Sequence, residues 1–189
     1  MKSRRIEEVK KEFSLFRLQD LTMTLAEFER TSSYNQYDAS TRYVMEMLKQ
    51  AGFRKSAEAG CTQALFKLGV FYYDGLGVQK DLRMAAKFFF QAARQGYVRA
   101  QYNLACLFEM GAVTGKADPE AAFYWFQQAA RGGDAAAQRR TGECYLNGVG
   151  VDRSISNAEK WLLLAARNGD FTARELLYRI QRSSTGSLY

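Results

Sequence analysis

Histidine is absent from this chain of 189 residues. Its absence excludes nucleophile–histidine triads, histidine metal sites and the usual general base near neutral pH. Proline occurs once, at Pro119, where average usage would give roughly nine, and this scarcity favours helices throughout. No pairing of acidic residues indicates catalysis, and the glycine turns at 75–78 and 148–151 lack the lysine and hydroxyl residue of a phosphate loop. We therefore expect no enzyme, no bound metal and no cofactor.

Cysteine and long apolar runs are also scarce. The three cysteines, Cys61, Cys106 and Cys144, are odd in number and form no Cys-x-x-Cys pair, so we expect free, buried thiols in a reducing compartment. The longest apolar runs fall far short of the ~18 residues that a membrane span needs. The basic N-terminus is followed by no apolar core and contains acidic residues, which argues against a targeting peptide. By default, these observations predict a cytoplasmic protein without a membrane span.

The sequence does contain an internal repeat. Gly60, Gly96, Gly133 and Gly169 recur at intervals of 36, 37 and 36 residues, and each is followed four residues later by an alanine. Three other series keep the same step, and these are Gly75, Gly111 and Gly148; Ala85, Ala122 and Ala158; and Ala92-Ala93, Ala129-Ala130 and Ala165-Ala166. The extra residue of the middle unit falls between Gly111 and Ala122, which marks a loop there.

Apolar spacing predicts two antiparallel helices in each unit. In the first unit the first helix runs roughly from Thr62 to Asp74. Asp81, Asp118 and Ser154 are suited to cap the second helices, and Pro119 then lies at a first helical position, where its missing donor costs nothing. A glycine that can adopt a left-handed conformation follows each second helix.

Small residues recur where helices would approach one another closely. Glycine or alanine occupies one position of the first helix in each unit, at Gly69, Ala105 and Gly142. We expect the repeated aromatic residues to fill the neighbouring gaps, and these are Phe88, Trp125 and Trp161. A helix of about 13 residues is marginal alone, so each unit needs the surface of its neighbour to stay folded.

The repeated residues resemble the Sel-1-like repeat. The first unit carries the pattern as Ala64, Leu68-Gly69, Tyr72 and Gly75-Leu76-Gly77-Val78, and an Ala-x-x-aromatic motif and an alanine pair follow it. The third unit has Thr141 where leucine is usual, and the second has lost the Gly-x-Gly-Val turn, so we expect its loop to be remodelled. The resemblance covers about residues 57–182. It implies a right-handed α/α superhelix, related to tetratricopeptide repeats, that acts as a non-catalytic adaptor or scaffold in protein assemblies.

The chain is therefore predicted to be an all-α solenoid of about three full repeats with half-repeat or capping helices at both ends. Residues 57–182 would form the solenoid, residues 1–56 a helical extension and residues 183–189 a flexible tail. The apolar stripe of the extension has two possible roles, because it can cap the first interface of the solenoid or dock on a partner or a second copy. This stripe consists of Ile6, Val9, Phe13 and Phe16.

The resemblance also indicates where a partner would bind. If the first helices line the concave side, as in tetratricopeptide proteins, nine residues face a groove, and these are Phe66, Val70, Tyr73, Arg99, Tyr102, Glu109, Arg139, Glu143 and Arg179. The groove would be aromatic at one end and charged at the other, which suits a peptide. The alternative is that Phe66 and Tyr102 pack against the N-terminal helices.

The net charge of +7 comes from 27 basic and 20 acidic residues. Arg94, Arg131 and Arg167 share one repeat position and should form a row along one edge, although each also lies in the last turn of a helix, where the dipole favours a cation. Our leading hypothesis is an adaptor that holds an acidic or peptide-like protein partner within a larger assembly. The alternative is a basic scaffold bound to RNA or a ribonucleoprotein, which no recognised nucleic-acid motif supports.

Overall fold

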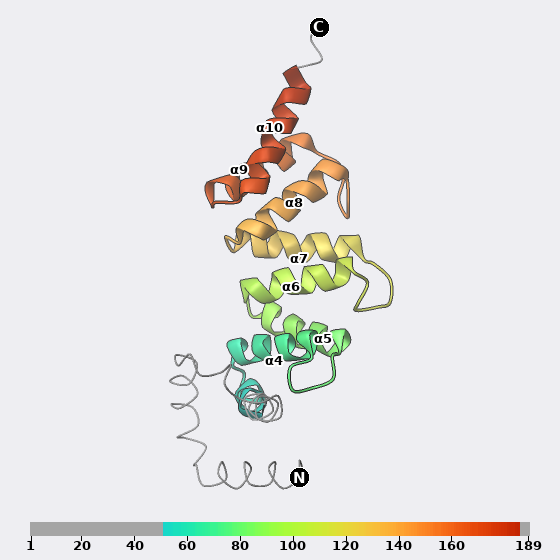
Figure 1. Ribbon diagram of the computed structural model, residues 1–189, viewed down its shortest axis with the longest axis vertical. Coiled ribbons are helices and arrows are strands. Elements are labelled where there is room, and N and C mark those ends of the chain that lie inside the picture. The colour runs from blue at the N-terminus through green and yellow to red at the C-terminus, as the bar shows by residue number, and fades with distance from the viewer. Residues whose placement is uncertain (1–50, 186–189) are drawn as a thin grey trace, which may run out of the picture.

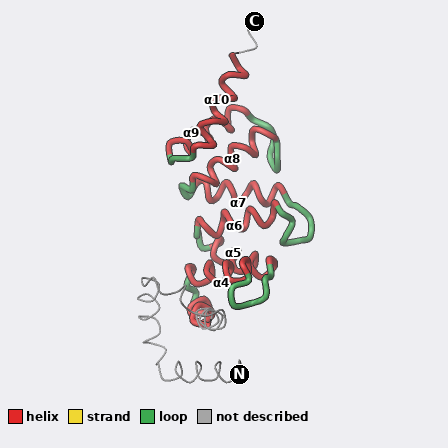
Figure 2. Tube along the Cα trace, viewed as in Figure 1, coloured by secondary structure: helices red, strands yellow, loops and turns green. Residues whose placement is uncertain are grey.

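The computed structural model describes residues 51–185 of the chain. A helical segment at 51–58 precedes a run of helices with defined bounds, and no residue of the described part is in a strand (Figure 2). The helices are α4 (Thr62–Asp74), α5 (Leu82–Arg94), α6 (Val98–Glu109), α7 (Pro119–Arg131), α8 (Ala135–Asn147), α9 (Ile155–Arg167) and α10 (Phe171–Thr185). The predicted stripe Ile6, Val9, Phe13 and Phe16 lies outside the described residues.

The helices stack in sequence order into an elongated array, with α4 near one end and α10 at the other (Figure 1). Each helix packs chiefly on the helix before it and the helix after it. This arrangement confirms the predicted α/α solenoid. The helix pairs α4–α5, α6–α7 and α8–α9 are the three units, and α10 is the additional first helix. It ends at Thr185, three residues beyond the expected boundary.

Side-chain caps begin the second helices where the sequence predicts them. Asp81 accepts hydrogen bonds from the backbone N–H groups of Arg83 and Met84, at 2.9 and 3.0 Å. Asp118 accepts from Ala121 N–H at 3.0 Å, and Ser154 caps α9 in the same way. These bonds satisfy backbone donors that have no partner inside the helix.

A glycine in the left-handed backbone conformation follows each second helix. Gly96, Gly133 and Gly169 have φ values of 82°, 90° and 93°, as the repeat pattern predicts. Gly111 keeps this conformation, but the loop behind it is longer than in the other units (Figures 1 and 2). Gly115 N–H donates to Gly111 O at 2.9 Å, which closes an additional turn. The predicted remodelling of this loop is therefore confirmed.

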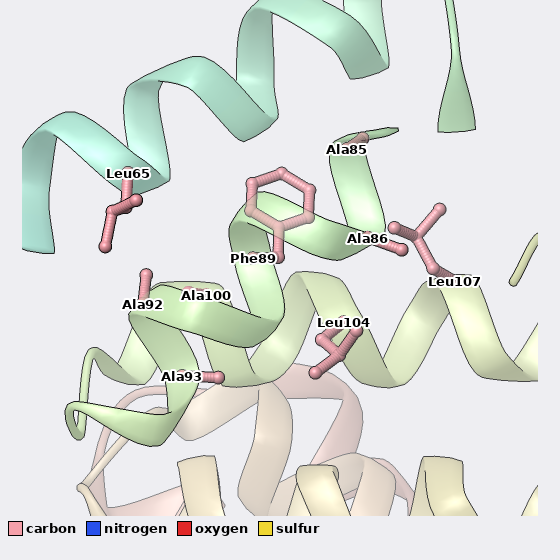
Figure 3. Close-up of a cluster of buried hydrophobic side chains, with 9 residues drawn as sticks. All are labelled: Leu65, Ala85, Ala86, Phe89, Ala92, Ala93, Ala100, Leu104 and Leu107. Carbon is pink, nitrogen blue, oxygen red and sulfur yellow. The ribbon is translucent and has the colours of Figure 1, made fainter. Parts of the chain in front are cut away.

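The core pairs a small residue of each first helix with a large residue of the second helix of the same unit. A Cβ atom built on Gly69 would lie 2.4 Å from the Phe89 ring, and one on Gly142 would lie 2.7 Å from Leu162 Cγ. In the middle unit Phe126 clusters with Ala105. Figure 3 shows Phe89 between Leu65 of α4 and Leu104 of α6.

The identity of the large residues corrects one prediction. Phe89, Phe126 and Leu162 are fully buried, whereas the expected Phe88, Trp125 and Trp161 are only half-buried. The large residue therefore comes one position later than the repeated aromatic. It lies four residues after Ala85, Ala122 or Ala158, where it points toward the glycine or alanine of the first helix.

Helix α10 differs from the other first helices at this same position. Tyr178 occupies the place of Gly69, Ala105 and Gly142 and is 62% exposed. The opposite face of α10 packs on α9, where Ala173 and Ile180 join Leu162 in a cluster. Helix α10 therefore closes the described stack.

The helical segment at 51–58 packs against α4. The Phe53 ring lies 5.8 Å from the Phe71 ring, and Arg54 Nη2 donates to the Tyr72 hydroxyl at 2.9 Å. These contacts support a capping role for this segment of the predicted extension.

Candidate partner-binding surface

The nine predicted groove residues lie on the four first helices. Helix α4 carries Phe66, Val70 and Tyr73, and α6 carries Arg99, Tyr102 and Glu109. Arg139 and Glu143 lie on α8 and Arg179 on α10. We call the surface formed by these positions the first-helix face. It changes from apolar to charged along the stack.

The aromatic residues at the α4 end have internal partners. The Phe66 ring lies 5.6 Å from Phe89 and 4.9 Å from Tyr97, so Phe66 is half-buried at the junction of three helices. Tyr73 is covered by Lys80, whose Nζ atom lies 5.5 Å from the centre of the ring. Both residues stabilise their unit and leave only part of each ring for a partner.

Tyr102 is also part of the packing. Its ring meets Phe126 edge to face at 5.6 Å, and burial raises the pKa of its hydroxyl. Cys106 packs against the same cluster, and the pKa of its thiol is likewise raised by burial. Substitution of Tyr102 would therefore disturb the core as well as the surface.

The charged end of the first-helix face forms a network that joins three first helices. Arg139 Nη1 lies 2.5 Å from Glu143 Oε1, and Arg139 Nε lies 3.0 Å from Asp170 Oδ2. Arg140 Nη1 lies 2.8 Å from Glu143 Oε2, and Arg140 also pairs with Glu109. The Glu109–Arg140 pair thus joins α6 to α8, and the Arg139–Asp170 pair joins α8 to the start of α10.

The surroundings of the network keep both arginines charged. Burial alone would lower the pKa of each guanidinium, but the hydrogen bonds and charges of Glu143 and Asp170 raise the pKa of Arg139. The pKa of Arg140 is raised against burial in the same way by Glu109 and Glu143.

Sequence reasoning missed Arg140 and Asp170. Arg140 stands three residues before Glu143, a spacing that brings side chains together on a helix, but the groove pattern selected only its neighbour Arg139. Asp170 precedes α10 as Asp134 precedes α8, and both cap their helices through backbone N–H groups, at 2.9 and 2.7 Å. The sequence did contain a signal for Asp170, because an aspartate stands three residues before the repeated alanine at both Ala137 and Ala173.

A groove of about 620 Å³ opens between α8, the start of α9 and α10. We call it the C-terminal groove. Four aliphatic residues line it, and these are Leu146, Ile155, Leu176 and Ile180. Its charged lining residues are Glu143, Arg153 and Arg179, two of which belong to the predicted set.

The predicted basic edge consists of exposed side chains. Arg94, Arg131 and Arg167 lie in the last turns of α5, α7 and α9, where the helix dipole stabilises a positive charge. Arg131 Nη2 donates to Gln127 Oε1 at 2.9 Å, and the Arg94 guanidinium lies 5.9 Å from the centre of the Phe90 ring. That they bind a partner stays a prediction.

The cysteines are free, but they are not all buried. Cys144 is buried and Cys106 half-buried, whereas Cys61 is exposed, which corrects one expectation. Burial raises the pKa of Cys144 from its ordinary value of 9.0 to about 11. Within residues 51–182, no group of three or more Cys, Asp or Glu residues could hold a metal ion. None of the described helices is long and apolar enough to cross a membrane.

The repeat geometry now has a counterpart among known families. The family model of the Sel1 repeat matches residues 62–97, 98–134 and 135–170, which are the three helix pairs with their connecting turns. This chain belongs to the Sel1 repeat family. Sel1 repeats imply a scaffold for protein–protein interaction.

Solved structures support the same assignment. The chain is similar to a Sel1 repeat protein from Oxalobacter formigenes, at 30% identity and a TM-score of 0.62, over 74% of this chain and 62% of that one. It is also similar to a protective antigen with an SLR fold present in uropathogenic Escherichia coli strains. This match has 28% identity and a TM-score of 0.72, and it covers 95% of this chain and 36% of the other.

Among curated proteins, a chitin synthase regulator of Malassezia restricta, SKT5, is 30% identical over 156 residues. The match covers 81% of this chain and 10% of that protein. Across four curated relatives, the chain spans between 10% and 21% of their length.

Proposed function

We propose that this chain is a non-catalytic adaptor that holds a protein partner on its first-helix face, as a subunit of a larger assembly. The observation that carries the proposal is the stack of three Sel1 repeats from residue 62 to residue 170. Repeat stacks present an extended surface whose side chains vary independently of the buried repeat positions. Three relatives are named as chitin synthase regulators or regulatory factors, which supports a role exerted on another protein.

The partner would contact the parts of the first-helix face that the internal contacts leave open. Arg99 on α6 is exposed, and the half-buried rings of Phe66 and Tyr73 lie on the preceding first helix. Aromatic rings beside arginine are common at the energetic centres of protein interfaces. The three free thiols support a reducing compartment, and we propose the cytoplasm.

Affinity purification of the full-length protein at two salt concentrations, followed by mass spectrometry, tests this proposal. We expect a protein that remains bound at the higher salt concentration, because apolar contacts are not screened by salt. Arg99→Glu should reduce its recovery several-fold. Arg83→Glu is the matched control, because Arg83 is an exposed arginine near the start of the second helix α5.

Two results would contradict the proposal. One is that no protein is enriched over a column carrying an unrelated helical protein. The other is that everything retained is released by nuclease, which would favour the RNA scaffold instead.

A further inference from the structure

The C-terminal groove lies at a position that is occupied in the middle unit. In that unit Glu109 on the first helix pairs with Arg140 on the next first helix, and the pair spans the space between them. One repeat later these positions are Leu146 and Leu176. Both leucines pack only partly into the cluster around Leu162, and the space between α8 and α10 remains open.

The first unit fills the corresponding space differently. There the position of Leu146 is Tyr73, and Lys80 lies over its ring. Arg153 is the counterpart of Lys80, because each immediately precedes the residue that caps the second helix. Arg153 instead donates from Nε to the backbone oxygen of Leu146 at 3.0 Å.

The charge of the groove is positive. Glu143 is its acidic lining residue, and both of its carboxylate oxygens already accept hydrogen bonds from Arg139 and Arg140. Arg153 has no salt bridge with any described residue, and its bond to Leu146 leaves the two terminal nitrogens of the guanidinium for another acceptor. Arg179 is the other basic residue of the lining.

We propose that the C-terminal groove binds an acidic protein segment that places aliphatic side chains on Leu146, Ile155 and Leu176 and a carboxylate on Arg153. A planar guanidinium binds a carboxylate through two parallel hydrogen bonds, which gives the contact a fixed direction. A volume of about 620 Å³ accommodates several side chains. This inference rests on the proposed adaptor function and names the chemistry of one partner site.

The lining favours a protein segment over RNA. Proteins that bind single-stranded nucleic acid stack the bases on aromatic side chains. The residues that line the C-terminal groove include no aromatic ring, and its apolar part is entirely aliphatic. Aliphatic side chains fit such a surface, whereas bases would find no stacking partner there.

Selection from a library of random dodecapeptides displayed on phage, with the full-length protein as target, tests the proposal. We expect the enriched sequences to combine Asp or Glu with Leu, Ile or Val. A peptide synthesised from the enriched set should bind more weakly as salt rises, because the carboxylate contact is screened. In methyl-labelled protein it should shift the resonances of Leu146, Ile155 and Leu176.

Variants of the lining residues then assign the site. The double substitution Leu146→Glu/Leu176→Arg transfers the ion pair of the middle unit into the groove and should abolish binding. Arg153→Gln should weaken it by at least about tenfold, the size expected for a lost charge-assisted hydrogen bond. Arg83→Gln removes an exposed arginine of α5, outside the groove, and should leave the affinity unchanged.

One variant guards against loss of the fold. Ile155 is 46% exposed at the first position of α9. The helix dipole stabilises a negative charge at this position, so an aspartate is tolerated there. Ile155→Asp should therefore keep the melting temperature while it repels an acidic peptide and lowers the affinity by tenfold or more. A peptide that binds this variant as tightly as it binds the wild-type protein would overturn the proposal.

The remaining outcomes are also decisive. Enriched peptides without acidic or aliphatic residues, or no enrichment at all, would overturn the proposed ligand class. The proposed ligand class is also wrong if a labelled uridine oligonucleotide displaces the peptide and its own binding depends on Leu176. If a cellular partner is recovered equally well by Arg153→Gln and the wild-type protein, the groove assignment fails while the adaptor function stands.

Discussion

At the scale of single residues, Phe126 and Trp125 are neighbours in different environments. Phe126 is 0% exposed and clusters with Ala105 and Ala122, whereas Trp125 is half-buried with its ring 5.9 Å from Phe90. Phe126→Ala should lower the free energy of unfolding by ~3–5 kcal/mol, as large core truncations do. Trp125→Ala should cost about half as much because less of its surface is buried. Chemical denaturation of both variants measures the difference.

This comparison also tests the assignment of the repeated aromatic positions. Equal losses for the two variants would show that Trp125 fills an interior gap, as its place in the repeat suggests. The sequence could not separate the two residues because positions three and four after an alanine lie on the same side of a helix. Only the packing of α6 against α7 decides which ring is enclosed.

The three cysteines should differ in reactivity. A disulfide reagent at neutral pH should modify the exposed Cys61 first, since Cys144 is buried with its pKa raised to about 11 and Cys106 is also shifted upward by burial. Mass spectrometry of the labelled protein over time would give the order. Fast labelling of Cys144 in the folded protein would contradict its burial.

The same shift makes stability depend on alkaline pH. Between pH 9.0, the ordinary pKa of the thiol, and about 11, the unfolded chain loses the Cys144 proton while the folded chain retains it. The folded state then binds more protons, so the free energy of unfolding must fall as pH rises through this window. Cys144→Ala should show a smaller fall. Urea denaturation of both proteins at several pH values measures it.

At the scale of helices, the sequence predicted bounds and caps well. Helix α4 begins at Thr62 and ends at Asp74, as apolar spacing and the glycine that follows indicate. Asp81, Asp118 and Ser154 cap their helices because capping is a contact between residues close in sequence. Local rules were sufficient for these features.

Asp170 joins a local contact to a distant one. Its carboxylate caps α10 through Ala173 N–H at 2.9 Å and pairs with Arg139 at 3.0 Å. Asp170→Ala should lower stability by ~1–2 kcal/mol and reduce hydrogen-exchange protection in α10. Asp170→Asn preserves a capping oxygen and should lose less than half of that. If the two variants were equally destabilised, the ion pair rather than the cap would hold α10.

At the scale of the whole molecule, the stack transmits a local disturbance only to neighbouring helices. Gly142→Ala would place a Cβ atom 2.7 Å from Leu162 Cγ, which should cost ~1–3 kcal/mol through overpacking. Because each unit contacts only adjacent units, we expect hydrogen exchange to accelerate in α8, α9 and α10 and to stay unchanged in α4 and α5.

Leu162→Val provides the control for this prediction. Leu162→Val removes a methylene group from the crowded site. When it is combined with Gly142→Ala, it should restore part of the stability that Gly142→Ala alone loses. Uniform acceleration of exchange across α4 to α10 would instead show a single cooperative unit.

The features of the candidate site depend on contacts between units, and this is where sequence reasoning ended. Glu109 and Arg140 are 31 residues apart, so their pairing follows from the rise of the stack and not from any helix period. The C-terminal groove exists because the same two positions carry leucines one repeat later. A single sequence shows both substitutions, but it does not show that they face each other.

Tyr178 also bears on attempts to lengthen the array by protein engineering. A grafted fourth hairpin would bring a bulky residue, the counterpart of Phe89 or Leu162, against the phenol ring, where its predecessors meet glycine or alanine. A designer who appends such a module should first change Tyr178→Gly, while insertion between existing hairpins would avoid the obstacle.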